Sequence, residues 1–201
     1  MCGRFYVPED EQNELLAMMI REASRRLQLL TGQSGVAVGE VFPDARVAAV
    51  ALGKDGTPGY FPMQWGFHRP EGGGLIINAR SETACRRPMF RESMENRRCL
   101  IPASHYFEWQ AAEAPGAARR KFAIHPRREP LMYLAAIYRY EEGLRLPVFS
   151  ILTRDAAPGI AFIHPRMPVI FTDGERWLDR GADPEALMRD CAREMDCRMA
   201  G

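Results

Sequence analysis

The apolar residues of this chain change their spacing about thirty residues from its start. Over residues 9–30, Leu15, Met18, Met19, Leu27 and Leu30 recur at helical spacing. Thr31 and Gly32 follow this segment directly. The pattern predicts one amphipathic helix that ends at the glycine.

The middle of the chain consists of short apolar runs separated by turns rich in Gly, Pro and Asp. These runs predict β-strands at residues 47–52, 59–67, 75–78, 98–103, 105–110, 121–126, 131–140 and 147–153. Near the end, Asp183 and Pro184 provide an N-cap and first turn for a second helix in PEALMRDCAREM.

This order of elements predicts an α+β fold with a mostly antiparallel, barrel-like β core. The predicted helices lie near the N- and C-termini, and we expect a single domain over residues 1–201. Strands and helices do not alternate as βαβ units, which argues against a Rossmann fold or a TIM barrel.

The composition is that of an ordinary globular protein. Hydrophobic residues make up 46% and charged residues 26%, with a net charge of +1. These values exclude a disordered tail and provide no overall basic field for nucleic acid. All basic residues except Lys54 and Lys121 are arginines. A GC-rich genome explains this bias, and a local arginine-lined groove for phosphates is the alternative.

The five cysteines stand at positions 2, 85, 99, 191 and 197. Their number is odd, their spacing is not that of a zinc site, and no signal peptide or membrane-spanning apolar run is present. We therefore expect a reduced, cytoplasmic protein without metal or cofactor. Buried free thiols are the expected state of Cys85, Cys99, Cys191 and Cys197.

Cys2 directly follows the initiator methionine. Removal of Met1 would leave a thiol and a free α-amine separated by two carbons. Such a 1,2-aminothiol attacks aldehydes and closes a ring, and the ordinary pKa values of both groups lie within about 1.5 units of neutrality. The alternative is a cysteine without function in a terminal tail.

Three further stretches contain candidate functional side chains. Asn78 and Arg80 come where the apolar run LII ends. One interpretation is that they are polar residues at a cleft, and the alternative is that Asn78 is an ordinary turn residue and Arg80 an ordinary surface charge. Glu108 lies between two aromatic residues in HYFEWQ. If these residues desolvate the carboxyl group, its pKa would rise into the range that suits proton transfer. The alternative is a carboxylate on the solvent face of a strand. His164 could transfer protons, and Arg166, two residues on, could hold a phosphate.

The segments MCGRF, WGF with INARSET, RRCLIPASHYFEW and IHPRMPVIF occur in this order along nearly the whole chain. Together they closely resemble the SOS response-associated peptidase family. The resemblance implies recognition of abasic sites in single-stranded DNA, including sites at junctions with duplex. It also implies a covalent thiazolidine crosslink between the ring-opened sugar aldehyde and Cys2. We expect the protein to be a monomer.

The resemblance also implies roles for the other candidates. Asn78 would orient the sugar and Cys2, Glu108 would act as acid and base, and His164 would protonate the sugar oxygen. Abasic-site lyase activity is an implied side reaction. Glu108 would also take part in crosslink reversal and in the self-removal of Met1.

DNA-contacting residues follow from the same resemblance. Arg4, Arg80 and Arg166 would hold phosphates, Pro43 would lie near the bent strand, and Trp65 would stack or simply pack. Arg86 and Arg87 match the family only loosely. The segments HRPEGGG and EVF depart from its pattern, because the first lacks tryptophan and the second lacks asparagine.

Two other classes of protein are consistent with parts of the sequence. N-terminal nucleophile hydrolases such as glutamine amidotransferases also begin with Cys-Gly after processing. A non-catalytic single-stranded DNA-binding module would use the arginines and aromatic residues alone.

Overall fold

The computed structural model of the chain describes residues 2–9, 13–70, 72–112, 114, 116 and 118–200. One antiparallel sheet in this part of the chain contains five strands in the order β15-β10-β9-β1-β2. Its strands are β1 (Arg4–Val7), β2 (Gly39–Val41), β9 (His105–Gln110), β10 (Arg120–Pro126) and β15 (Met195–Met199).

The larger sheet of the described residues closes partly on itself. Strands β12, β4, β3, β8 and β11 pair in a ring, with β7, β13 and β14 paired at its edges. All pairs are antiparallel except those of β12 with β4 and with β7. The expected mostly antiparallel, barrel-like core is therefore confirmed for this part of the structure. These strands are β3 (Arg46–Leu52), β4 (Pro58–Trp65), β7 (Asn78–Arg80), β8 (Arg98–Ala103), β11 (Met132–Arg139), β12 (Val148–Asp155), β13 (Arg166–Pro168) and β14 (Ile170–Phe171).

A small hairpin formed by β5 (Phe67–His68) and β6 (Leu75–Ile76) interrupts two of the predicted strands. Gly66 separates β4 from β5 with a φ of 122°, and a Cβ at this position would lie 2.8 Å from the Cβ of Leu75. The chain turns there because only glycine fits this conformation and this close approach.

The predicted N-terminal helix is present as α1 (Glu14–Thr31). The side chain of Asn13 caps its first turn by accepting a hydrogen bond from the Leu16 amide, and Gly32 ends it in the left-handed conformation. Residues 10–12 of the predicted helix lie outside the described residues. The buried face of α1 consists of Leu16, Met19, Ala23 and Leu27.

The remaining helices differ from the prediction. The helices α2 (Ser81–Ala84) and α3 (Pro88–Asn96) lie in the middle of the chain, and α4 (Glu175–Leu178) and α5 (Pro184–Arg189) lie near its end. The helix predicted over PEALMRDCAREM ends at Arg189, and the chain then enters β15. Pairing with β10 explains this difference, because it satisfies the backbone of residues 195–199 from a distant segment.

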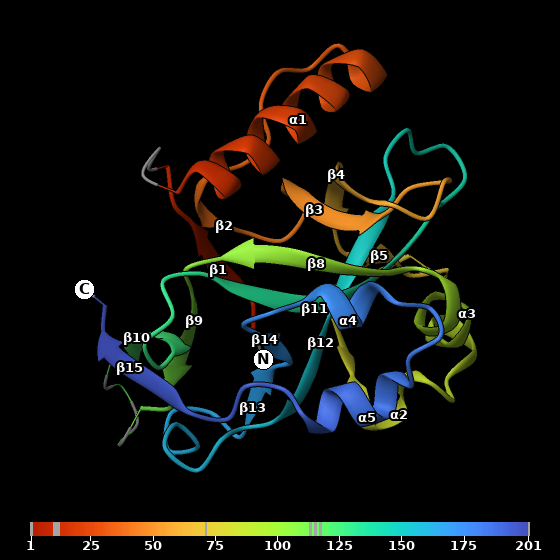
Figure 1. Cartoon of the computed structure of the whole chain (residues 1–201). Helices are drawn as coiled ribbons and strands as arrows, with labels where there is room; N and C mark the ends of the chain where they lie inside the picture. The colour runs from red at the N-terminus through yellow and green to blue at the C-terminus, as the bar shows by residue number, and fades with distance from the viewer. Residues whose placement is uncertain are drawn as a thin grey trace.

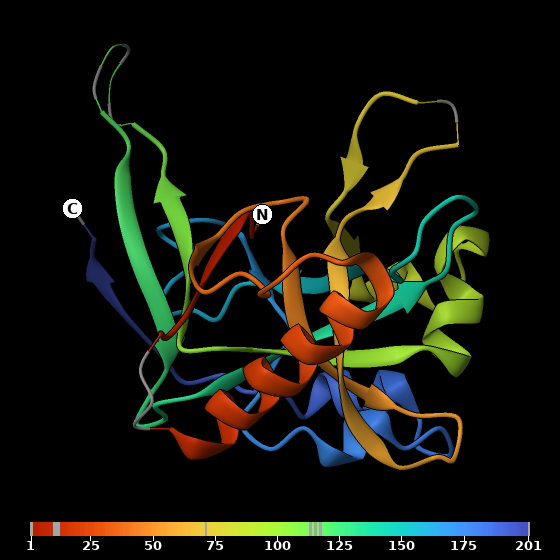
Figure 2. The same ribbon diagram turned by 90° about the horizontal axis from the view of Figure 1, so that it is seen from above.

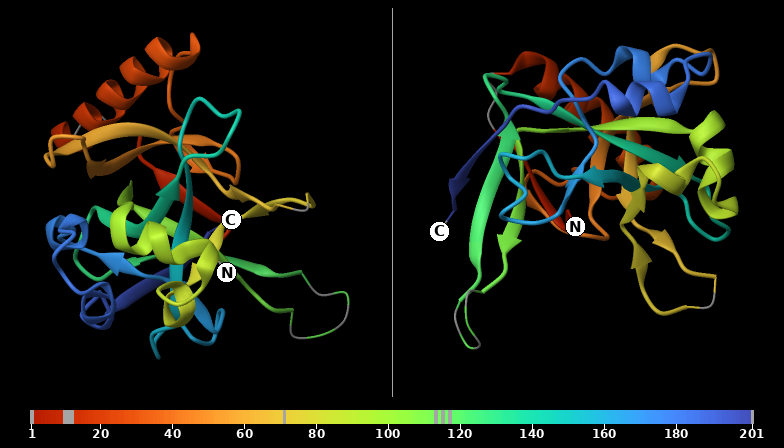
Figure 3. Two further views of the ribbon diagram at one scale, coloured as in Figure 1. Left: turned by 90° about the vertical axis from the view of Figure 1, so that its right-hand side faces the viewer. Right: turned by 90° about the horizontal axis from the view of Figure 1, so that it is seen from below.

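Two hairpins project from the same side of the molecule, with the N-terminal segment between them (Figures 2 and 3). One hairpin contains β9 and β10, and the other contains β5 and β6. In Figure 1, α1 covers the opposite end of the barrel from β13. The chain therefore begins close to both β9 and β7, the strands that carry Glu108 and Asn78.

Candidate active site at the N-terminus

Cys2 is part of the hydrophobic core, next to the start of β1. Its side chain has no exposed surface, and Sγ lies 3.7 Å from the carbonyl oxygen of Arg4. Burial, followed by the nearby Glu108 carboxylate, raises the pKa of the thiol well above its ordinary value. The thiol is therefore protonated at neutral pH. Met1, whose removal the sequence predicts, lies outside the described residues.

Asn78 fixes the backbone of Cys2. Its Nδ2 donates a hydrogen bond of 2.9 Å to the Cys2 carbonyl oxygen, across 76 residues of sequence. The preceding Ile77 carbonyl accepts from the Trp65 indole at 3.0 Å and from the Ile151 amide at 3.0 Å. Asn78 Oδ1 is buried and has no hydrogen-bond partner among the described residues. A rigid strand end thus presents one donor to Cys2 and keeps one acceptor available.

Glu108 lies in the middle of β9 and is only 6% exposed. This burial excludes the solvent-facing alternative. The Trp109 amide donates to Glu108 Oε1 at 3.3 Å. The carboxylate is close enough to act electrostatically on both Cys2 and Tyr106, and it contributes to raising the pKa of each. Tyr106 was not among the predicted site residues, although strand alternation places it on the same face as Glu108.

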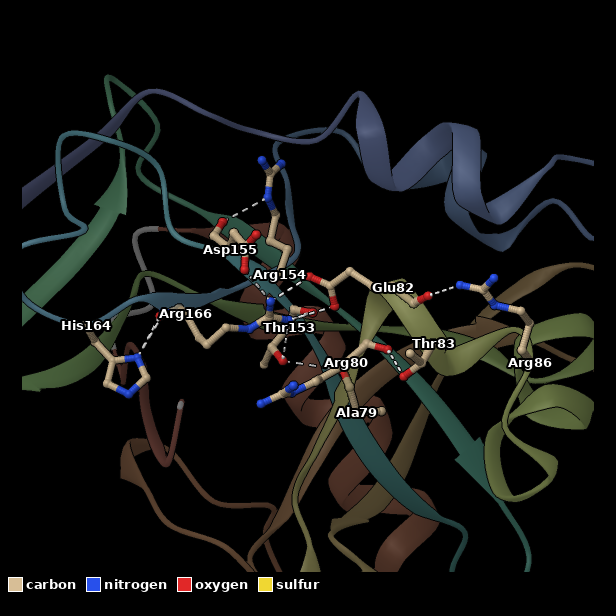
Figure 4. Close-up of polar contacts among 10 residues, drawn as sticks. All are labelled: Ala79, Arg80, Glu82, Thr83, Arg86, Thr153, Arg154, Asp155, His164 and Arg166. Carbon is tan, nitrogen blue, oxygen red and sulfur yellow. Dashed lines mark hydrogen bonds and ion pairs between the residues drawn. The ribbon is translucent and has the colours of Figure 1, made fainter.

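His164 lies in the loop before β13, and Figure 4 shows its ring turned toward the Arg166 backbone. The Arg166 amide nitrogen lies 3.0 Å and the Arg166 carbonyl oxygen 3.2 Å from His164 Nδ1, so the Arg166 backbone fixes the orientation of the ring. His105, at the start of β9, is a weaker candidate for proton transfer. Burial, followed by nearby Arg198, lowers the pKa of His105 to about 4, which leaves it neutral at pH 7.

Arg166 is already bound by acidic groups (Figure 4). Its guanidinium lies 2.6 and 2.9 Å from the two carboxylate oxygens of Glu82, 2.6 Å from Asp155 and 2.7 Å from the Thr153 carbonyl oxygen. The pKa of Glu82 is lowered, chiefly by this arginine. Neither Glu82, which lies within the INARSET motif, nor Asp155 at the end of β12 was among the predicted site residues.

Arg4 and Lys121 share one carboxylate beside two aromatic rings. Arg4 Nη1 lies 3.1 Å and Lys121 Nζ 2.9 Å from Glu40 Oε1. The Arg4 guanidinium lies 4.5 Å from the Phe42 ring centroid and 4.8 Å from that of Trp109. This cationic and aromatic cluster joins β1, β2, β9 and β10.

The other predicted DNA contacts differ in their exposure. Arg80 is exposed, and no carboxylate lies within ion-pair distance of it in the described part of the chain. Pro43 is partly exposed beside Phe42, and Arg86 and Arg87 are exposed next to α2 and α3. Trp65 has no exposed surface and packs 5.0 Å from the Phe5 ring. Of the two interpretations of Trp65, packing is therefore correct, and a stacking contact with DNA is excluded in this conformation.

Nothing in the described residues groups three or more His, Cys, Asp or Glu side chains as metal ligands. Across the same residues, no helix has the length and apolar character needed to cross a membrane. The site instead brings a buried thiol, the Asn78 amide and the Glu108 carboxylate together around Cys2.

The sequence matches the model of a known protein family and several known proteins. The model of the family described as SOS response associated peptidase matches residues 1–200. "Abasic site processing protein YobE" from Bacillus subtilis is 32% identical over 136 residues, which cover 62% of this chain and 61% of that protein. "Abasic site processing protein YoaM" from the same organism is 30% identical and covers 74% of this chain and 72% of its own length. This chain thus spans about three fifths of the length of YobE.

Solved structures with the same fold are more distant in sequence. A protein from Bacteroides thetaiotaomicron has a TM-score of 0.75 at 21% identity, covering 98% of this chain and 91% of its own. A phage-related protein from Bordetella bronchiseptica has a TM-score of 0.73 at 20% identity, covering 99% and 94%. At these identities the likeness shows the fold alone.

Proposed function

Because this chain belongs to the SOS response-associated peptidase family, we propose that it processes abasic sites in single-stranded DNA through Cys2. After Met1 is removed, the α-amine and thiol of Cys2 capture the aldehyde of the ring-opened deoxyribose. The observation that carries this proposal is the position of Cys2, which is hydrogen-bonded by Asn78 and lies within electrostatic reach of Glu108.

The reaction consists of two bond-forming steps. The α-amine nitrogen attacks the aldehyde carbon, and the resulting carbinolamine loses water to give a protonated Schiff base. Sulfur then adds to the same carbon, and the thiol proton is transferred to a base. The product is a thiazolidine with one new C–N bond and one new C–S bond, at the loss of one water molecule.

The surrounding side chains suit these proton transfers. Since the pKa of the Cys2 thiol is raised, sulfur needs a base when it attacks, and Glu108 is close enough to serve. Asn78 Oδ1 is available to accept from the α-amine while Nδ2 holds the Cys2 carbonyl. His164 would protonate the sugar ring oxygen and so favour the open aldehyde.

The same Schiff base permits a side reaction. It acidifies the neighbouring sugar carbon, so β-elimination of the 3′ phosphate would cleave the strand. Closing the thiazolidine removes the Schiff base and protects the strand. Return of a proton to sulfur, assisted by Glu108, would break the C–S bond and restore the protonated Schiff base, which water would then hydrolyse to the aldehyde and the free amine. The same carboxyl would assist self-removal of Met1.

Phosphates flanking the lesion would be held by cations around the N-terminus. Arg80 is exposed and available to a DNA backbone, whereas the partly exposed Arg4 would contact a phosphate by sharing its guanidinium with Glu40. Arg166 could contact a phosphate only by sharing its guanidinium with Glu82 and Asp155. We propose that the protein acts in the cytoplasm as a monomer, on single strands and on their junctions with duplex.

Intact-mass measurement after incubation with an abasic oligonucleotide tests this proposal. We expect a protein that lacks Met1 and has gained the oligonucleotide less one water. Cys2→Ser keeps the amine, so it should give a labile Schiff base or strand cleavage instead. Cys85→Ser, which changes a partly exposed thiol at a distance from this site, is the matched control and should crosslink normally.

An added alanine between Met1 and Cys2 provides the decisive comparison, because it retains the thiol but moves the α-amine away. Undiminished crosslinking by this variant, or an active protein that still carries Met1, would disprove the aminothiol mechanism. Turnover of glutamine that depends on Cys2, without any DNA adduct, would instead identify an N-terminal nucleophile hydrolase. Full DNA binding by Cys2→Ala with no adduct from the unaltered protein would identify a binding module.

A further inference from the structure

An apolar groove lies between the second half of α1, the turn after β3 and the segment between β11 and β12. It encloses about 590 Å³, and its apolar lining includes Leu29, Leu30, Pro62, Met63, Tyr140 and Pro147. Leu29 is 73% exposed and Tyr140 is 67% exposed. Such exposure of large apolar side chains around one cavity is typical of a surface that binds a partner.

The same groove is lined by five cations: Arg25, Arg26, Lys54, Arg145 and Arg180. Its lining contains no aspartate or glutamate, although the whole chain has a net charge of only +1. The groove therefore concentrates positive charge around an apolar surface.

The cations differ in how far they are neutralised. Arg25 and Arg26 both form ion pairs with Glu22. In the described residues, no carboxylate lies within 4.0 Å of the side-chain nitrogens of Lys54, Arg145 or Arg180. Arg145 Nη1 donates instead to the Leu30 carbonyl oxygen at 3.2 Å, which holds this cation at the edge of the groove.

We propose that this groove binds an acidic peptide segment of a partner protein, with apolar side chains in the cavity and carboxylates at the cationic rim. Its volume lies within the range of about 300–1,000 Å³ that is typical of ligand pockets, and it would hold a few apolar side chains. Three aromatic residues also line the groove, but the Arg26 guanidinium lies over the Phe61 ring at 4.4 Å and Tyr138 is only 8% exposed. Tyr140 alone among them offers an open ring, which favours a peptide over nucleic acid, because bases need a series of open aromatic surfaces. Charge complementarity would select the partner and speed its association.

The groove is separate from the N-terminal site. Figure 1 places α1 at one end of the molecule and β13 with the preceding loop at the other. A partner bound along α1 would therefore leave Cys2, Asn78 and His164 free. This inference does not depend on the chemistry proposed for Cys2.

Fluorescence anisotropy with the full chain and a labelled decapeptide of alternating Asp and Leu tests the proposal. We expect saturable binding that weakens steeply as salt is raised. Peptides in which Lys replaces Asp, or Ser replaces Leu, should bind at least roughly tenfold more weakly, because each lacks one of the two matched features.

Protein variants locate the binding surface. The double change Lys54→Glu and Arg145→Glu should weaken binding roughly tenfold or more, and Leu29→Asp should weaken it comparably. All three side chains are exposed, so circular dichroism and thermal unfolding should show an intact fold. Arg91→Glu with Arg128→Glu, a double change of the same charge at exposed positions outside the groove, should leave binding unchanged.

Three results would overturn the inference. They are absence of saturable peptide binding, equal binding by the groove variants, and tighter binding of an oligothymidylate than of the acidic peptide at this same surface. The last result would identify a nucleic-acid site instead.

Discussion

The side chain of Asn78 hydrogen-bonds the backbone of Cys2 to the barrel. Its amide reaches the Cys2 carbonyl, and its strand is fixed by the bonds that Trp65 and Ile151 make to the neighbouring Ile77 carbonyl. A surface tail of this length would ordinarily move freely. The terminal residue that carries the proposed nucleophiles is instead held in one orientation, which lowers the entropic cost of reaction.

Asn78→Asp should slow crosslinking by about fivefold, because the variant keeps the shape of the side chain but loses the donor to Cys2, a bond of about 1 kcal/mol. Single-turnover crosslink formation with an abasic oligonucleotide measures this effect. The same change at Asn96, at the exposed end of α3, is the matched control and should have no effect. A normal rate for Asn78→Asp would show that the amide does not position Cys2.

At the scale of elements, a set of ion pairs joins three segments that are distant in sequence. Arg166 at the start of β13 binds Glu82 in α2 and Asp155 at the end of β12 (Figure 4). The side chain of Arg166 is only 13% exposed, whereas that of Glu82 is 47% exposed. This contact joins the segment that follows His164 to α2, which directly follows β7.

Glu82→Gln should lower the free energy of unfolding by about 1 kcal/mol at pH 7, a value that allows for solvent screening of the carboxylate. The pKa of Glu82 is lowered by Arg166, so the stabilisation is present above the ordinary pKa of glutamate and is lost as pH falls through the lowered value. The difference between variant and unaltered protein should therefore shrink toward pH 3.

Urea unfolding at pH 7 and pH 3 measures this difference. Glu92→Gln removes a carboxylate that pairs with Arg97 on the exposed face of α3, and it should cost less than Glu82→Gln. Equal effects of the two changes would show that the Arg166 pairs do not join these elements energetically.

At the scale of the whole molecule, two thiols buried in the core make the free energy of unfolding depend on pH in the alkaline range. Cys2 and Cys99 have no exposed surface, and burial raises the pKa of both well above the ordinary value. In the unfolded chain the same thiols ionise near pH 8.5. The folded state therefore binds more protons at alkaline pH, and its stability falls as pH rises.

Cys99→Ala should reduce the alkaline loss of stability by about 1.4 kcal/mol per pH unit above pH 9, the contribution of one thiol. Urea unfolding between pH 8 and pH 10.5 measures the slope. Cys85→Ala should change it less, because that thiol is partly exposed. An unchanged slope in Cys99→Ala would mean that Cys99 also ionises in the folded protein.

The sequence predicted well those elements whose signals are local. The helix α1 follows from the spacing of its apolar residues, its cap at Asn13 and its end at Gly32, and the predicted strands of the core are present with small shifts of their ends. The helix predicted after Asp183 was too long, and β15 was not predicted. The segment after Arg189 has a helical pattern, but it gains more from pairing with β10.

The sequence alone determined the family and the candidate chemistry, because a terminal cysteine and the motifs around Asn78, Glu108 and His164 can be identified without any distance. Only the tertiary structure decided that Cys2 is buried, that Asn78 binds its carbonyl and that Glu108 lies nearby. It also decided that Trp65 packs in the core and that Arg166 is bound by two carboxylates. These relations join residues up to 106 positions apart (Cys2 and Glu108), and they exist only when the strands pair and close the core around the chain terminus.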